Sequence, residues 1–220
     1  MVAEEMINNM IPSLKLTDLV SDALSWMDEF RVCHLPVVFE DEYLGLVSEN
    51  QLYELPNENE ALGSYKINFK RPFVFGNQHI FDVVKSIGEN KLTTIPIVGK
   101  DEQYLGLTTS VDLIEHLTRL ASFHEQGGII ILTMNVHDYS LAEIARIVES
   151  NDTKILSSHV ASSYDSSQVE LVLKLNNTDL TRIIASFDRF GYTIKESYHE
   201  SEQDDNLQDR YDTLMNFLKF

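Results

Sequence analysis

The sequence predicts a mixed α and β fold, and three patterns support this prediction. The first is an internal repeat, because residues 21–54 align with residues 81–115. The second is the order within each copy: a helical apolar spacing, two short apolar runs around a turn, and a second helical spacing. The third is a separate alternation of strand-like and helix-like segments that begins after residue 127. Together they predict two copies of one small unit and then a third, different unit.

Composition narrows the class of protein and its partners. The chain has 220 residues, 35 acidic against 17 basic, for a net charge of −18, and its hydrophobic fraction of 43% is that of a globular protein. Such an acidic surface repels phosphate backbones and anionic membranes, so neither nucleic acid nor a membrane is expected as a partner. The lone Cys33 excludes an internal disulfide. The N-terminus has Glu4 and Glu5 where a signal peptide needs positive charge. We expect a cytoplasmic protein.

The two copies share their pattern of apolar residues as well as identical residues. Each opens with apolar residues at i, i+3, i+4 and i+7, one face of a helix. These residues are Val20, Ala23, Leu24 and Met27 in the first copy, and Ile80, Val83, Val84 and Ile87 in the second. The runs HLPVVF and TIPIVG follow, each with a second strand that ends in Tyr-Leu-Gly-Leu and a closing helix.

This pattern resembles the CBS domain, which normally occurs as a tandem pair. The resemblance rests on the proline strand and on G-h-h-[ST]-x-x-D-[LI], which the second copy matches from Gly106 to Leu113. The first copy matches it from Gly45 to Leu52, except that Gln51 stands where the family has aspartate. The resemblance implies two β-α-β-β-α repeats, with boundaries expected at 1–58 and 59–124.

The resemblance also implies a ligand and the residues that bind it. Pairs of this family bind adenosyl compounds, so AMP, ADP, ATP or S-adenosylmethionine is expected as a regulatory ligand. Thr109 would face its phosphate or ribose, and Asp112 would hold the ribose hydroxyls. The remaining implied residues are Thr94, Ile95 and Pro96 at the adenine, His34, Ser48 and Gln51 at a weaker first site, and Arg31 and Lys91 as phosphate contacts.

A plain structural interpretation of the same motif stays open. The spacing [ST]-x-x-D is also a helix N-cap pattern, which stabilises a helix by about 1 kcal/mol without any ligand. The alternative function is therefore a ligand-free module that assembles oligomers or holds a partner protein.

The C-terminal third predicts a different fold. Its segments read βαββαβ over residues 127–200, a ferredoxin-like order, with Ser140 and Glu143 as a capping box. This order resembles an ACT domain, and a CBS pair before it resembles the acetoin-utilisation-type CBS proteins of bacteria. ACT domains often pair, so we expect a homodimer through both modules. Glycine is missing from the turn at 136–140, which argues against an amino-acid site there. Residues 201–220 predict an acidic tail with an amphipathic helix.

No catalytic constellation is apparent, so we expect a regulatory protein and not an enzyme. The histidines show no HExxH spacing, and phosphate-binding glycine loops and G-x-S-x-G are absent from the sequence. No metal or cofactor site is expected. Cys33 is expected to be a small buried side chain and not a nucleophile.

Overall fold

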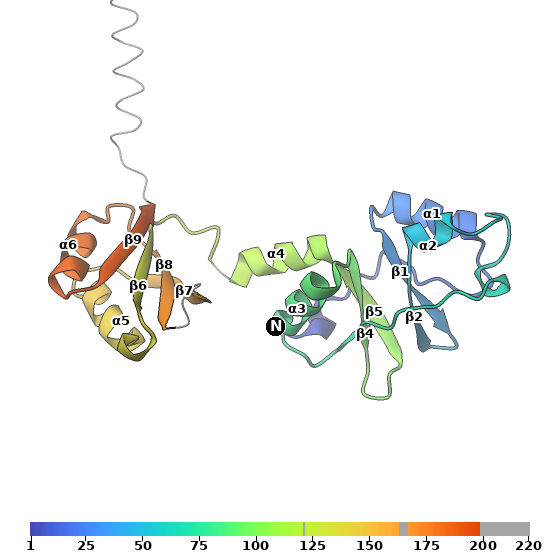
Figure 1. Ribbon diagram of the computed structural model, residues 1–220, viewed down its shortest axis with the longest axis horizontal. Helices are drawn as coiled ribbons and strands as arrows, with labels where there is room; N and C mark the ends of the chain where they lie inside the picture. Colours follow the sequence, from blue (N-terminus) through green and yellow to red (C-terminus); the bar gives the residue numbers. More distant parts are fainter. Residues whose placement is uncertain (121, 163–166, 199–220) are drawn as a thin grey trace, which may run out of the picture. The chain divides into compact units, whose positions relative to one another are not determined.

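The computed structural model describes residues 1–120, 122–162 and 167–198, and the chain forms two compact units (Figure 1). The first unit is Met1–Leu117, and the second begins at Thr118. Both contain helices and sheets, which confirms the mixed fold class. The predicted tail at 201–220 lies outside the described residues, as do the last two residues of the predicted 127–200 domain.

The first repeat has the predicted order. Its elements are α1 (Val20–Glu29), β1 (His34–Phe39), β2 (Glu42–Ser48) and α2 (Glu49–Tyr53). Three of the four apolar positions predicted for the first helix are fully buried, because their spacing places them on one face. The strands β1 and β2 form an antiparallel hairpin.

The second repeat has the same order and one additional strand. Its elements are β3 (Val74–Phe75), α3 (Ile80–Asn90), β4 (Thr94–Val98), β5 (Tyr104–Thr109) and α4 (Ser110–Leu120). β3 lies parallel to β4, with Val74 opposite Ile97. In the first repeat the corresponding strand is reduced to one parallel bridge, between Leu14 and Val37.

Two segments cross between the repeats, so the packing differs from the simple order of the sequence. The N-terminal η1 (Ala3–Met6) belongs to the core of the second repeat. The segment from η2 (Leu62–Ser64) to Phe69 packs on the core of the first. Each segment also bonds to the outer strand it reaches: Asn8 N–H donates to the Leu107 carbonyl, and Leu46 N–H donates to the Lys70 carbonyl. The expected boundary at 58/59 follows the repeat in the sequence. In the structure, the N-terminal segment packs in the core of the second repeat, and the segment from Leu62 to Phe69 packs on the core of the first.

The glycine of each motif makes room for the crossing segment. A Cβ on Gly45, whose φ is +150°, would lie 2.6 Å from Phe69 Cβ and 2.7 Å from the Lys70 carbonyl oxygen. A Cβ on Gly106, whose φ is +158°, would lie 2.5 Å from Ile7. Glycine is needed at both positions because the backbone has positive φ and the crossing chain is in contact.

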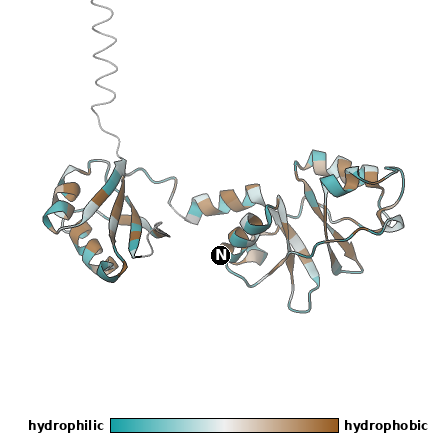
Figure 2. Cartoon of the chain, in the orientation of Figure 1, coloured by the Kyte–Doolittle hydropathy of each residue, from teal (hydrophilic) through white to brown (hydrophobic). Residues whose placement is uncertain are grey.

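The second unit has the predicted βαββαβ order. Its elements are β6 (Ile129–Asn135), η3 (Val136–Asp138), α5 (Leu141–Glu149), β7 (Ile155–Ser162), β8 (Gln168–Leu175), α6 (Thr181–Arg189) and β9 (Thr193–Tyr198). The sheet order is β7-β8-β6-β9 with antiparallel neighbours throughout, which is the ferredoxin-like arrangement. Both helices cover one face of the sheet (Figure 1), and the strands carry both hydrophobic and hydrophilic residues (Figure 2).

Candidate functional site

Two cavities of related construction lie in the first unit. Each combines the N-cap motif of one repeat with the residues that end the first helix of the other repeat. The cavity at Ser48 and Gln51, which we call cavity 1, has a volume of about 620 Å³. The cavity at Thr109 and Asp112, cavity 2, has about 310 Å³. Ligand pockets span roughly 300 to 1,000 Å³, so only cavity 1 lies well inside that range.

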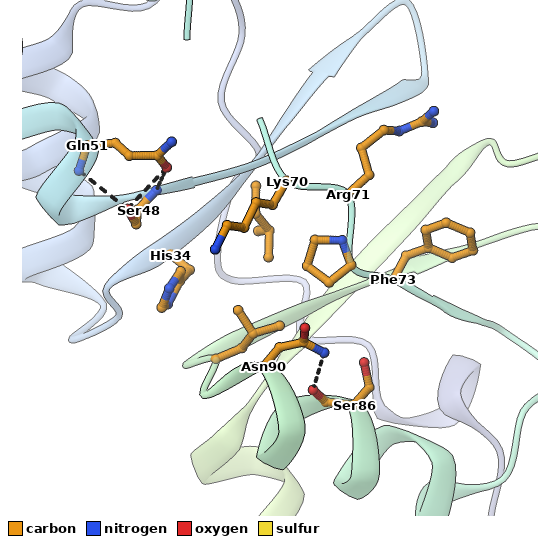
Figure 3. Close-up of a pocket in the computed structure, with 11 residues that line it drawn as sticks. His34, Ser48, Gln51, Lys70, Arg71, Phe73, Ser86 and Asn90 are labelled. Carbon is orange, nitrogen blue, oxygen red and sulfur yellow. Dashed lines mark hydrogen bonds between the residues drawn. The ribbon is translucent and has the colours of Figure 1, made fainter. Parts of the chain in front are cut away.

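Cavity 1 is lined by basic, polar and apolar side chains (Figure 3). Its basic side chains are Lys70 and Arg71, and the described residues that line it include no carboxylate. The other lining residues are His34, Leu46, Ser48, Gln51, Pro72, Phe73, Ser86, Asn90 and Leu92. In a protein with a net charge of −18, such a cavity is electrostatically suited to an anion.

Ser48 and Gln51 hydrogen-bond to each other as a helix cap. Ser48 N–H and the Ser48 hydroxyl both donate to Gln51 Oε1, at 3.0 and 3.1 Å. Gln51 N–H donates to Ser48 Oγ, and Gln51 Nε2 donates to the Asn68 carbonyl at 3.3 Å. Gln51 therefore hydrogen-bonds both within the cap of α2 and to the crossing segment. Both acceptor sites of its Oε1 are occupied.

His34 connects cavity 1 to the second repeat. Thr93 N–H donates to His34 Nδ1 at 3.4 Å, and the Thr93 hydroxyl lies 3.1 Å from the same nitrogen. Because Nδ1 accepts, the neutral ring carries its proton on Nε2 and can donate from there. Burial and then the nearby charge of Lys70 lower the pKa of His34 below its ordinary value of 6.5. His34 is therefore a neutral hydrogen-bond donor near pH 7.

The two cations of cavity 1 differ in their hydrogen bonds and ion pairs. Arg71 donates to the Tyr43 carbonyl at 2.9 Å and pairs with Glu102 at 3.2 Å. Lys70 has no ion pair or side-chain hydrogen bond within the described parts of the chain. Its ammonium is directed toward the side of the cavity that holds His34, whereas Arg71 points the other way (Figure 3). Lys70 is thus the available cation.

Cavity 2 differs in holding a carboxylate in its motif, and the cation Arg31 also lines it. Asp112 Oδ2 accepts from the Thr109 hydroxyl at 2.8 Å, from Thr109 N–H at 3.2 Å and from Asn8 Nδ2 at 2.9 Å. Thr109 Oγ1 accepts in turn from Asp112 N–H. One carboxylate oxygen is therefore fully engaged by a capping box and by the N-terminal crossing segment, and within the described residues Oδ1 accepts no hydrogen bond.

The structure brings some of the predicted site residues together and separates others. His34, Ser48 and Gln51 line cavity 1, while Thr109, Asp112 and Arg31 line cavity 2. The three residues expected at an adenine are buried in β4 and line neither cavity: Thr94, Ile95 and Pro96. Thr94 donates its hydroxyl to the His34 carbonyl instead. Lys91 ends α3 in a left-handed conformation and also lines neither cavity.

Sequence reasoning missed the crossing segments. Lys70 and Asn8 occupy equivalent places, since Lys70 pairs with Leu46 and Asn8 with its repeat counterpart Leu107. The segments that precede α1 and α3 lie outside the aligned residues 21–54 and 81–115, so the alignment did not reveal this. A signal was present nonetheless in the motif glycines, which mark where another chain segment approaches closely.

A further cavity of about 540 Å³ lies in the second unit, at the turn that precedes α5. Asp138 and Glu143 line it, together with Tyr192 and the turn at Gly191. Burial and then the charge of Glu143 raise the pKa of Tyr192, which leaves its phenol neutral. Two carboxylates at this turn disfavour the carboxylate of an amino-acid ligand.

Cys33 differs from its expected placement. It is exposed and not buried, because it lies between α1 and β1 with its N–H bonded to Thr93 Oγ1. Partial desolvation and then the neighbouring Glu49 raise the pKa of its thiol, which makes it a poor nucleophile. The described residues contain no group of three metal-ligating side chains, and no described helix is long and apolar enough to cross a membrane.

Comparisons with known proteins found similar solved structures. No protein-family model matches the chain. Among similar solved structures is a CBS domain pair/ACT domain protein of Thermotoga maritima, at 17% identity and a TM-score of 0.49, with 55% of this chain and 98% of that one covered. Another is CBSX2 of Arabidopsis thaliana, at 18% identity and a TM-score of 0.46, with 54% and 95% covered. A third comprises the CBS domains of a Streptococcus pneumoniae transcriptional regulator, at 19% identity and 0.46, with 52% and 98% covered. These three solved structures contain CBS domains.

Proposed function

We propose that the protein is a non-enzymatic regulatory protein of the CBS-pair type, which senses an adenine nucleotide or S-adenosylmethionine in its first unit. The observation that carries the proposal is the pair of related cavities between the repeats. Each is built from both repeats, so a ligand in either one contacts both and can alter how they pack. In this proposal the protein acts in the cytoplasm, which suits a chain with one cysteine and therefore no internal disulfide.

The second unit has a supporting part in the proposal. We propose that it is an ACT-like domain that pairs with a second copy of the chain and so passes the state of the first unit to a dimer. Its βαββαβ order and antiparallel sheet support this assignment. The carboxylates at its own cavity favour pairing over amino-acid sensing.

A ligand-free structural module is the second candidate function. It is favoured by one specific observation: Ser48 with Gln51, and Thr109 with Asp112, already satisfy each other as helix caps. In this alternative the motifs only stabilise the fold, and the two units assemble oligomers or hold a partner protein.

A melting screen separates the two candidates. Trp26 is the single tryptophan and lies in α1, so its fluorescence follows the first unit alone. A ligand present at 100 times its Kd stabilises the fold by about 2.7 kcal/mol. We expect at least one of ATP, ADP, AMP and S-adenosylmethionine to raise the transition followed by Trp26. If none does, the sensor proposal fails and the structural module is the better description.

A further inference from the structure

Cavity 1 has one cation that its own surroundings leave without an opposite charge. Lys70 enters the cavity from the crossing segment, and its backbone carbonyl is fixed by Leu46 N–H at 2.7 Å. Its neighbour Arg71 is engaged with Glu102 and with the Tyr43 carbonyl. A backbone held by a strand and a side chain without a counter-ion are what an anion-binding lysine requires.

The groups around Lys70 are donors as well. His34 can donate from Nε2, since its Nδ1 accepts from Thr93 N–H. Burial keeps that ring neutral, so it does not repel the ammonium. An anionic oxygen placed between Lys70 and His34 would receive one charged and one neutral hydrogen bond.

Among the described residues that line it, the same cavity lacks a carboxylate, the charged acceptor that can take a hydrogen bond from each hydroxyl of a vicinal diol. A carboxylate offers two equivalent acceptor oxygens side by side, whereas an amide offers one. Gln51 occupies the place of Asp112, and its single acceptor oxygen already takes two hydrogen bonds from Ser48. The described residues that line the cavity supply no carboxylate in its stead.

We propose that cavity 1 selects its ligand by an anionic group, such as a phosphate, held by Lys70, and that it is indifferent to the ribose diol. The apolar lining by Leu46, Pro72, Phe73 and Leu92 suits a planar base. The ligand class is therefore a nucleoside phosphate, ribo or deoxyribo, in preference to a free nucleoside. This inference rests on the proposed function in that the ligand carries a base.

Calorimetric titration tests the proposal with AMP, 2′-deoxy-AMP and adenosine. The proteins are the wild type, Lys70→Ala and, as a matched control, Lys66→Ala, an exposed lysine of the same crossing segment that does not line the cavity. We expect AMP and 2′-deoxy-AMP to bind the wild type within about twofold of each other, and adenosine at least about tenfold more weakly. Lys70→Ala loses at least about tenfold in AMP affinity, and Lys66→Ala binds as the wild type does.

Two results would overturn the proposal while leaving nucleotide sensing intact. One is AMP binding that Lys70→Ala leaves unchanged. The other is binding of 2′-deoxy-AMP that is tenfold or more weaker than that of AMP. If Asp112→Ala loses AMP binding and Lys70→Ala keeps it, the ligand binds in cavity 2, and the proposal for cavity 1 is wrong.

A second readout separates this inference from the proposed function. The melting transition followed by Trp26 is measured in sodium pyrophosphate and in sodium chloride at equal ionic strength. If no nucleotide binds but pyrophosphate stabilises the wild type and not Lys70→Ala, the nucleotide proposal fails and the anion site stands. If pyrophosphate shifts the melting transition of the wild type and of Lys70→Ala equally, the proposed anion site at Lys70 is wrong.

Discussion

The two cavities of the first unit are built alike and differ in charge: two cations line cavity 1, whereas Asp112 and Arg31 both line cavity 2. In cavity 1 the motif position holds the neutral Gln51, and the crossing segment contributes Lys70. In cavity 2 the motif position holds Asp112, and the crossing segment contributes Asn8. Where the motif has a neutral residue the crossing segment supplies a cation, and where the motif has a carboxylate the crossing segment supplies a neutral amide.

The difference shows what each part of a cavity determines. The N-cap residue and its partner three positions on are satisfied locally in both repeats, so they set the start of a helix whether or not a ligand is present. In cavity 1 the side chain of the crossing residue, Lys70, takes no part in the helix cap. In cavity 2 the crossing residue Asn8 donates a hydrogen bond to the cap residue Asp112. In cavity 1 the charge available to a ligand is thus set by the crossing segment, whereas in cavity 2 it comes from Asp112 of the motif and from Arg31.

The largest expected effect comes from displacing a crossing segment. In Gly45→Ala the added Cβ meets the Lys70 carbonyl oxygen, and the residue must also keep a positive φ. We expect a loss of about 2 to 3 kcal/mol in the free energy of unfolding of the first unit. Urea denaturation followed by Trp26 fluorescence measures it.

Gly88→Ala is the matched control for that substitution. Gly88 lies inside α3 with no atom within 4 Å of an added Cβ, so alanine there stabilises the helix by about 0.5 to 1 kcal/mol. Equal effects of the two substitutions would contradict the role given to Gly45.

The two motif positions should differ in their contribution to stability. Asp112→Ala removes hydrogen bonds from both Thr109 and Asn8, and we expect it to destabilise the first unit by about 1 to 2 kcal/mol. Gln51→Ala should cost about 0.5 to 1 kcal/mol, because its bonds are between neutral groups. The same denaturation experiment ranks them. A larger loss for Gln51→Ala would reverse the comparison.

A buried hydroxyl distinguishes the strands of the two repeats. Thr108 Oγ1 is buried and has no hydrogen-bond partner among the described residues, while the first repeat has the buried Val47 at the same place. Thr108→Val keeps the shape and removes the unsatisfied group, so we expect a gain of about 1 kcal/mol in the free energy of unfolding. Thr94→Val is the control with the opposite sign, since Thr94 donates to the His34 carbonyl. A loss of stability in Thr108→Val would show that its hydroxyl is satisfied.

The smallest expected effect is the pH response of cavity 1. Because the pKa of His34 is lowered in the fold, the unfolded chain takes up this proton first as the pH falls below about 6.5. The contribution of His34 to stability is therefore full at pH 7 and decreases toward pH 5. His34→Thr, which installs the residue of the second repeat, should show a shallower loss of stability over this range.

The wild type, measured at the same pH values, provides the reference for that measurement. If His34→Thr keeps the full slope, another group causes it.

Much of the fold could be predicted from local patterns. The 3.6-residue spacing in α1 and α3 determines which side chains are buried, and the proline strands and acidic turns specify the hairpins. The βαββαβ order of the second unit followed from the same patterns. The exposure of Cys33 could not be predicted this way, since it lies in a connection without periodicity.

The sequence by itself determined the repeat, the motif pair and the overall acidity, because each is a property of neighbouring residues or of a count. Only the tertiary structure decided that Lys70 enters cavity 1 and that Asn8 bonds to Asp112. Those contacts join residues far apart in the chain, and they arise because each hairpin completes its hydrogen bonds with a segment exchanged between the repeats. The charge of cavity 1 is therefore a product of the crossing, and not of the motif alone.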